Sequence, residues 1–148
     1  MKKILILLLS ILYSFCIITN AQQKIVSLTP SITESLYLLD EKNNIVGITT
    51  FCRKISRDQK IVGAYLEPNI EEIVKLNPDV VFISKEGTRK EVVESLENFR
   101  IKVVVFEPVN SFNEIKLQFL DLAKFLNKQK KAELIINEYE KKLLSFKN

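Results

Sequence analysis

The chain has 148 residues, a formal net charge of +4 and no histidine. This length fits a single domain, and so mild a charge argues against a nucleic-acid partner. Without histidine the chain lacks the commonest general base and the commonest metal ligand, so Ser–His and Cys–His nucleophile pairs are excluded and a zinc site is disfavoured. We predict no catalytic residue, metal or other cofactor.

The N-terminus has the pattern of a secretory signal peptide. Lys2 and Lys3 precede an apolar run at residues 4–18, and small residues lead to Ala21. We predict a signal peptide over residues 1–21, cleavage near Ala21, and export to the periplasm. A transmembrane anchor is the alternative, but the apolar run is shorter than the roughly 20 residues that span a bilayer.

The two cysteines are Cys16 and Cys52. A lipid anchor at Cys16 stays open, although bulky Phe15 stands before it where a small residue is expected. Cleavage would leave Cys52 alone, which rules out an intramolecular disulfide. Because no histidine is present to activate Cys52, we interpret it as a semi-buried thiol rather than a nucleophile.

Short β-rich runs alternate with helical patterns through most of the chain. The expected strands are residues 24–28, 45–49, 61–62, 80–83 and 102–106. The run at 80–83 is continuously apolar, as expected for a parallel strand covered on both faces. We therefore predict an α/β fold with a parallel sheet of about four to five strands and helices on both faces.

Capping patterns predict where the helices between these strands begin. The expected pairs are Ser31 with Glu34, Asn69 with Glu72, Thr88 with Glu91, and Ser111 with Glu114. Apolar spacing predicts their buried faces: Ile32, Leu36 and Leu39; Ile70, Ile73 and Val74; Val92, Leu96 and Phe99; Ile115, Phe119, Leu122 and Leu126. A last helix is expected over about residues 129–146, with Ala132, Ile135, Ile136, Tyr139 and Leu143 on its apolar face.

The carboxyl ends of parallel strands meet at one edge of the sheet, where ligands of such sheets bind. We expect the ligand-binding residues there to be Pro30, Ser31, Phe51, Tyr65, Ser84 and Lys85. The two aromatic residues have polar or small neighbours, which favours a ligand wall over a place in the core. With three glycines and no glycine-rich phosphate motif, nucleotide binding is disfavoured. Glu86 and Glu107 are candidates for an acid–base pair, with solvated loop acids as the simpler interpretation.

Residues 24–39, KIVSLTPSITESLYLL, resemble the opening of the class III periplasmic binding proteins. These are the ABC-importer subunits that bind vitamin B12, ferric siderophores or haem. Further matches follow in the same order: IVGIT then Phe51-Cys52, Val62-Gly63, PNIE from Pro68, and LNPDVV from Leu76. The resemblance covers residues 24–146 and is closest to the B12-binding branch.

The resemblance implies ligand contacts for individual residues. Pro30 and Ser31 would form the first ligand loop. Phe51 and Tyr65 fall where related proteins place aromatic rings against the ligand. Ser84 falls where the B12-binding branch often has another aromatic, which implies a thinner wall in this chain.

The resemblance also implies partners and domain boundaries. Glu71, or Glu72 in its place, would dock on arginines of a membrane permease; the alternative is an acid favoured simply by the helix N-terminus. Family members have two lobes joined by a long helix. Residues 22–128 would then be the N-terminal lobe and 129–148 the start of the interlobe helix, with the second lobe absent. Apolar residues of 129–148 form a candidate self-association surface.

From these observations we predict a single solute-binding lobe of an ABC importer that performs no chemistry. The lobe would be a truncated gene product, one part of a split protein, or a lobe completed by oligomerisation. Its ligand would be a corrinoid, a ferric siderophore or haem. One alternative is a degenerate docking module that binds no ligand. The other is a small exported α/β enzyme that uses Glu86 and Glu107.

Overall fold

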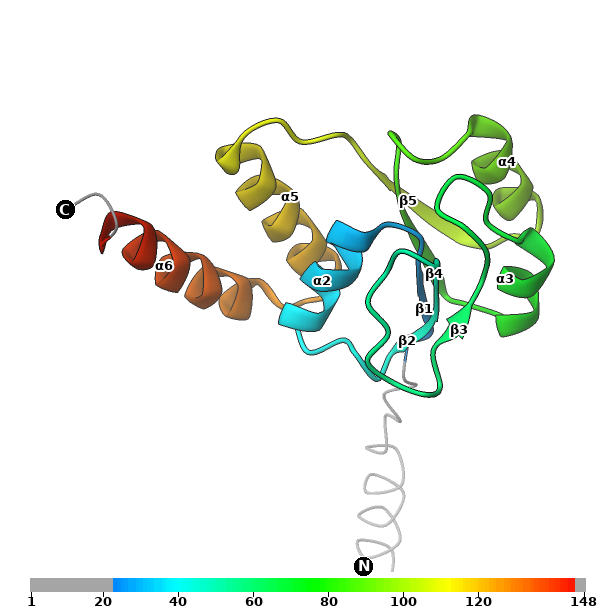
Figure 1. Cartoon of the computed structure of the whole chain (residues 1–148), viewed down its shortest axis with the longest axis horizontal. Coiled ribbons are helices and arrows are strands. Elements are labelled where there is room, and N and C mark those ends of the chain that lie inside the picture. Colours follow the sequence, from blue (N-terminus) through cyan, green and yellow to red (C-terminus); the bar gives the residue numbers. More distant parts are fainter. Residues whose placement is uncertain (1–22, 146–148) are drawn as a thin grey trace, which may run out of the picture.

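The computed structural model describes residues 23–145 (Figure 1). The predicted signal peptide, its cleavage site near Ala21 and the possible lipid anchor at Cys16 lie outside these residues. Within the described part of the chain, no helix is long and apolar enough to cross a membrane.

Five parallel strands form one sheet in the order β3-β2-β1-β4-β5. They are β1 (Ile25–Ser27), β2 (Ile45–Ile48), β3 (Lys60–Ile61), β4 (Val80–Ser84) and β5 (Lys102–Phe106). The predicted parallel sheet and the places of all five strands are confirmed. The chain builds outward from β1 to β3 on one side, and then returns to pair β4 with the other side of β1. The sheet therefore has a topological switch point between β1 and β4.

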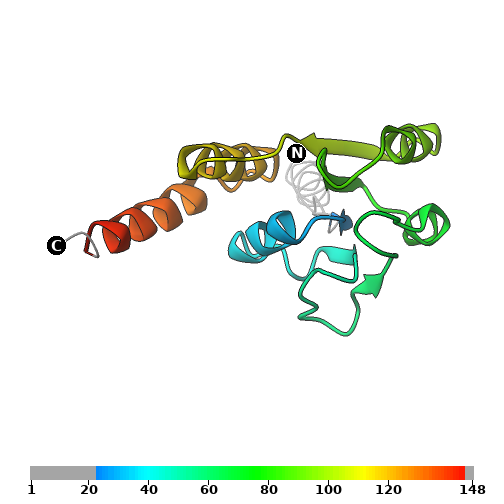
Figure 2. The same ribbon diagram turned by 45° about the horizontal axis from the view of Figure 1, so that its top comes forward.

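Helices cover both faces of the sheet, as predicted (Figure 2). The helices are α2 (Pro30–Leu38), α3 (Ile70–Leu76), α4 (Lys90–Asn98), α5 (Phe112–Phe125) and α6 (Gln129–Ser145). Residues of α2, α5 and α6 pack with Ile25 and Phe82 in one core cluster. Residues of α3 and α4 pack with Val26 and Val81 in the other. Neighbouring strand residues thus belong to opposite faces, which explains why β1 and β4 are apolar throughout.

Two of the predicted helix caps are confirmed and two are wrong. The Asn69 side chain accepts a hydrogen bond from the Glu72 N–H at 3.0 Å, and Ser111 accepts one from the Glu114 N–H at 3.2 Å. In α2 the N-cap is Thr29, so Pro30 takes the first helical position and Ser31 lies inside the helix. The fixed φ of proline suits that position, so the helix begins earlier than the Ser31 pattern indicates.

The N-cap of α4 is Arg89, without a side-chain cap bond, rather than Thr88. The hydroxyl of Thr88 is buried and has no hydrogen-bond partner among the described residues. The turn from β4 into α4 is therefore set by its contacts with the rest of the protein and not by capping at Thr88.

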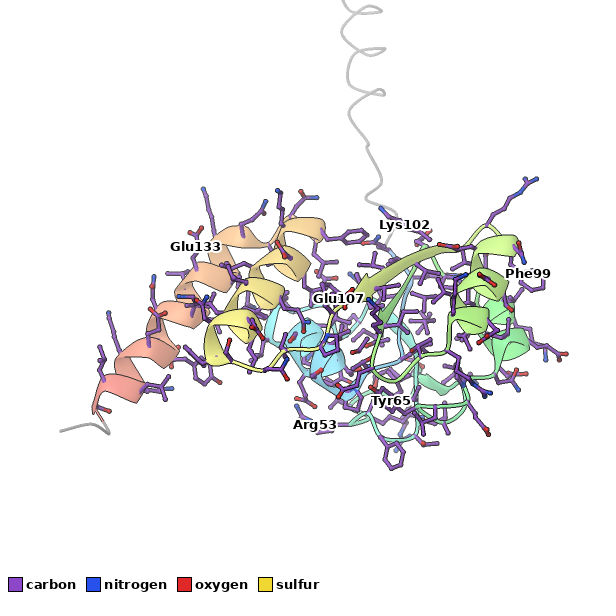
Figure 3. All side chains as sticks on the ribbon, turned by 90° about the horizontal axis from the view of Figure 1, so that it is seen from above. Arg53, Tyr65, Phe99, Lys102, Glu107 and Glu133 are labelled. Atoms are coloured by element: carbon purple, nitrogen blue, oxygen red, sulfur yellow. The ribbon has the colours of Figure 1, made fainter. Side chains whose placement is uncertain are left out.

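The predicted buried faces are correct at the helix centres and wrong at two ends. Phe99 is 59% exposed, because it lies one residue past the end of α4, where the helical spacing stops (Figure 3). Ile115 is 52% exposed, because the first turn of α5 extends beyond the sheet (Figure 1). In α6, Ala132 is buried, but Tyr139 and Leu143 are about half exposed.

The confirmed cap provides a test of how α3 is stabilised. Asn69→Ala is expected to lower the free energy of unfolding by about 1 kcal/mol, because the Glu72 N–H loses its acceptor. Ser31→Ala is the matched control and should change stability by less than about 0.5 kcal/mol, since its side chain caps nothing. Urea unfolding of both variants measures the difference. Equal losses would contradict this account of the caps.

Candidate functional site

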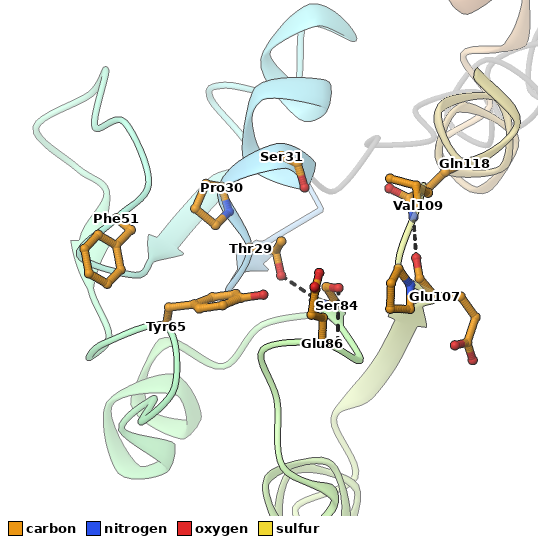
Figure 4. A pocket seen from close by; sticks show the side chains of 11 residues that line it. Thr29, Pro30, Ser31, Phe51, Tyr65, Ser84, Glu86, Glu107, Val109 and Gln118 are labelled. Atoms are coloured by element: carbon orange, nitrogen blue, oxygen red, sulfur yellow. Dashed lines mark hydrogen bonds between the residues drawn. The ribbon is translucent and has the colours of Figure 1, made fainter. Parts of the chain in front are cut away.

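A cleft of about 380 Å³ opens at the carboxyl ends of β1, β4 and β5. Its lining residues are Thr29, Pro30, Ser31, Phe51, Tyr65, Ser84, Glu86, Glu107, Pro108, Val109 and Gln118 (Figure 4). It lies at the switch point, where the loop after β1 leads to a helix on one face and the loop after β4 leads to a helix on the other. Diverging loops leave a crevice there, which is where open α/β sheets bind ligands.

The structure brings five of the six expected ligand-binding residues to this cleft: Pro30, Ser31, Phe51, Tyr65 and Ser84. The sixth, Lys85, is not among its lining residues. Its ammonium contacts the Glu107 carboxylate at 2.9 Å on the surface. Successive side chains at the end of a strand point to opposite sides. Because the buried Ser84 side chain faces the cleft, that of Lys85 points away from it.

Thr29 joins the two sides of the switch point. β1 pairs with β4 up to Ser27 and Phe82, and the Leu28 N–H still donates to the Phe82 carbonyl at 2.9 Å. The chain then leaves the sheet into α2. At this point the Thr29 hydroxyl accepts the Ser84 N–H at 2.9 Å, in place of a backbone carbonyl. The floor of the cleft is therefore held together by a buried side chain.

A buried polar cluster lies directly beneath this floor. The Thr33 hydroxyl lies 2.8 Å from the Ser27 hydroxyl and 3.2 Å from the Cys52 sulfur. The Thr49 hydroxyl contacts the same sulfur at 3.2 Å. Cys52 thus links the loop after β2 to β1 and α2. It is 6% exposed, so it is a buried thiol and not the semi-buried one expected from the sequence.

The loop after β2 holds Phe51 out at the cleft edge, where its side chain is 74% exposed. On the far side of this loop, the fully buried Gln59 accepts hydrogen bonds from the Ile55 and Ser56 backbone N–H groups at 3.1 and 3.3 Å. The Phe51 ring is held at the surface although it is not buried against the rest of this chain. Such a placement is consistent with a ring that contacts a ligand.

A further anchor of this loop was missed by sequence reasoning. The Arg53 guanidinium donates to both Glu34 carboxylate oxygens, at 2.9 and 2.6 Å. These hydrogen bonds hold the pKa of Glu34 below its usual value. Glu34 was predicted to cap α2 with Ser31, and only the fold brings it to Arg53. The one available signal was that an acid and a base stand on neighbouring segments and that the base, Arg53, had no assigned role.

Tyr65 lies across the turn that follows β4 (Figure 4). A Cβ atom built on Gly87 would lie 1.8 Å from the Cζ of Tyr65 and 2.2 Å from its hydroxyl, so the ring occupies space that any other residue at position 87 would need. Burial raises the pKa of Tyr65, the charge of Glu86 adds to this, and a hydrogen bond with Ser84 opposes it. The phenol therefore stays protonated at neutral pH and can act as a hydrogen-bond donor.

The two acids at the cleft, Glu86 and Glu107, do not face one another. The Glu86 side chain lies beside Ser84 and points toward the cleft, whereas the Glu107 side chain points away from it (Figure 4). Glu107 pairs with Lys85, and its carbonyl accepts from the Gln118 amide at 2.9 Å. This arrangement does not suit paired acid–base work. Within the described residues, no group of three or more Cys, Asp or Glu side chains is placed to hold a metal.

Glu71 and Glu72, the expected docking acids, lie outside the cleft on the exposed first turn of α3. The loop from Gly63 to Pro68, which carries Tyr65, leads directly into this turn and is closed by an antiparallel bridge between its ends. Glu72 contacts the Lys75 ammonium at 2.6 Å. Glu71 has no ion-pair partner among the described residues, so its carboxylate is the more available of the two.

The contact between Gly87 and Tyr65 can be tested without a ligand. Gly87→Ala is expected to destabilise the protein by about 1–3 kcal/mol, because the new methyl group displaces the ring. In a Tyr65→Ala background the same change should cost little, since the obstructing atoms are gone. Urea unfolding of the two single variants and the double variant measures the coupling. Additive costs would show that the ring does not depend on the glycine.

Comparison with known proteins places this geometry in a family. The model of the family described as periplasmic binding protein matches residues 25–148. An uncharacterised ABC transporter substrate-binding lipoprotein, YvrC, of Bacillus subtilis is 26% identical over 131 residues, which cover 85% of this chain and 41% of that protein. The vitamin B12-binding protein of Pectobacterium carotovorum is 23% identical, over 82% of this chain and 44% of that protein.

Among solved structures, Staphylococcus aureus SirA complexed with staphyloferrin B is 29% identical, with a TM-score of 0.69. The match covers 87% of this chain and 45% of SirA. The chain thus spans less than half the length of each of these three proteins. Because the family model matches nearly all of the described residues, the chain belongs to the periplasmic binding protein family.

Proposed function

We propose that this chain is an exported solute-binding component of an ABC importer, and that its ligand is a corrinoid, a ferric siderophore or haem. The observation that carries the proposal is the convergence of Pro30, Ser31, Phe51, Tyr65 and Ser84 on one cleft at the switch point. The names of the relatives support it, since one binds vitamin B12 and another is seen with staphyloferrin B.

The cleft suits capture of a large, partly apolar ligand. Phe51 and Tyr65 offer ring faces, while Ser31, Ser84 and the Tyr65 phenol offer hydroxyl groups. A few polar groups placed among apolar walls are typical of small-molecule sites. Since the two cleft acids point in different directions and the chain has no histidine, we propose binding without catalysis.

Titration of the purified chain tests this proposal. Isothermal titration is run with cyanocobalamin, haemin and ferric staphyloferrin B, and at least one should bind. Phe51→Ala and Tyr65→Ala are each expected to weaken that binding about tenfold, because each removes a large contact area from the cleft. Phe99→Ala, which removes an exposed ring outside the cleft, is the control and should bind normally. Failure of all three ligands to bind would contradict the proposed function.

We further propose that Glu71 docks the chain on the arginines of a membrane permease. Its carboxylate is exposed and unpaired within the described residues, whereas that of Glu72 already contacts Lys75. Glu71→Arg should therefore reduce binding to permease-containing proteoliposomes by more than tenfold, and Glu72→Arg by less. Co-sedimentation with the vesicles measures both. Equal, small effects would leave Glu71 as an ordinary N-terminal helix acid.

The surface of α6 favours a second proposal, that two copies of this chain associate. Two large apolar side chains, Tyr139 and Leu143, are about half exposed on one face of this helix, whereas exposed Leu134 lies on the opposite face. An apolar groove of about 210 Å³ between α2, α5 and α6 continues this surface.

Sedimentation equilibrium tests this association. The chain is expected to form a dimer that Tyr139→Glu or Leu143→Glu weakens by at least tenfold, because each places a charge on apolar surface that the dimer would bury. Phe99→Glu is the control, since it places the same charge at an exposed position just after α4, away from α6. A monomer at all concentrations would rule out the dimer and leave the α6 surface to another partner.

A further inference from the structure

The charge of the cleft is one-sided. Among the described residues, those that line it include Glu86 and Glu107 but no lysine or arginine. Lys85, the positively charged residue next to Glu86 in the sequence, contacts the Glu107 carboxylate at 2.9 Å outside the cleft. The opposite charges of Lys85 and Glu107 largely cancel. The negative charge at the cleft therefore comes mainly from the Glu86 carboxylate.

Glu86 is placed where a ligand would meet it. Its side chain lies beside Ser84 and points toward the part of the cleft that the Tyr65 hydroxyl also faces (Figure 4). It has no ion-pair partner within the described residues, and its side chain is exposed. Its charge acts on the Tyr65 phenol: burial is the main cause of the raised pKa of Tyr65, and the Glu86 carboxylate is the second.

Building on the proposed function, we infer that Glu86 determines specificity by excluding ligands that present a carboxylate to the turn after β4. An unpaired carboxylate repels a second one at close range, and no lysine or arginine in the lining that the structure describes offsets this repulsion. The same carboxylate accepts hydrogen bonds from neutral N–H or O–H groups, and these bonds are stronger than those of a neutral acceptor. The favoured ligand is therefore neutral or cationic at this edge.

The three candidate ligand classes differ in whether they carry carboxylates, which Glu86 would repel. Haem carries two propionate carboxylates, and citrate-type ferric siderophores carry several. The rim of a corrinoid carries carboxamides, which are neutral and donate hydrogen bonds. Glu86 consequently favours a carboxamide-rimmed ligand, or any other ligand that turns an uncharged edge toward Glu86.

A pair of probes that differ in one charge tests this inference. Cyanocobalamin and its monocarboxylic acid, in which one carboxamide is hydrolysed, are titrated into the full chain at low salt. The unmodified chain should bind the carboxamide form about tenfold more tightly. In Glu86→Gln the two dissociation constants should become equal, and in Glu86→Lys the preference should reverse. Added salt should reduce the preference of the unmodified chain, because it screens the charges.

Glu97→Gln is the matched control, since it removes the same charge from an exposed position on α4. It should leave the preference unchanged. If either probe binds but the ratio of dissociation constants is the same in all variants, the inference is wrong and the proposed function stands. If neither probe binds to any variant, while haemin binds the unmodified chain, the inference is again wrong. Failure of all ligands overturns both the inference and the proposed function.

Discussion

The hydrogen bond from the Ser84 N–H to the Thr29 hydroxyl joins the two halves of the site. The strands β1 and β4 lie side by side, but the loops that follow them separate toward opposite faces of the sheet. Without a backbone partner at that point, Ser84 would leave a buried N–H unsatisfied, which is costly. The threonine side chain supplies the partner. The loops can thus diverge and form a cleft while the strand ends stay together.

The walls of the cleft depend on contacts made well away from it. Phe51 is exposed, yet its loop is held on one side by buried Cys52 and on the other by buried Gln59. The ring of Tyr65 rests in space left free by Gly87. Both rings are therefore positioned before any ligand arrives. Such preorganisation lowers the ordering cost of binding a ligand at the cleft.

Sequence reasoning recovered the parts of this molecule that depend on local pattern. Apolar runs identified all five strands, and the alternation of strands and helices indicated the parallel sheet. The cap at Asn69 was predictable because its partner, the Glu72 N–H, lies three residues away. The cap predicted at Ser31 was wrong because the equally local preference of Pro30 for the first helical turn outweighed it. Phe99 followed the helical spacing but falls after the helix ends.

The sequence by itself determined the fold class, the strand positions and the edge of the sheet where a ligand would bind, because these follow from short-range periodicity and the rules of parallel sheets. Only the tertiary structure decided which residues at that edge share one cleft. It directed Lys85 to Glu107, paired Glu34 with Arg53, and turned the Glu86 side chain toward the cleft. These outcomes join residues distant in sequence, and side-chain direction at a loop has no local signature. Long-range packing, and not pattern, therefore decided the charge and shape of the site.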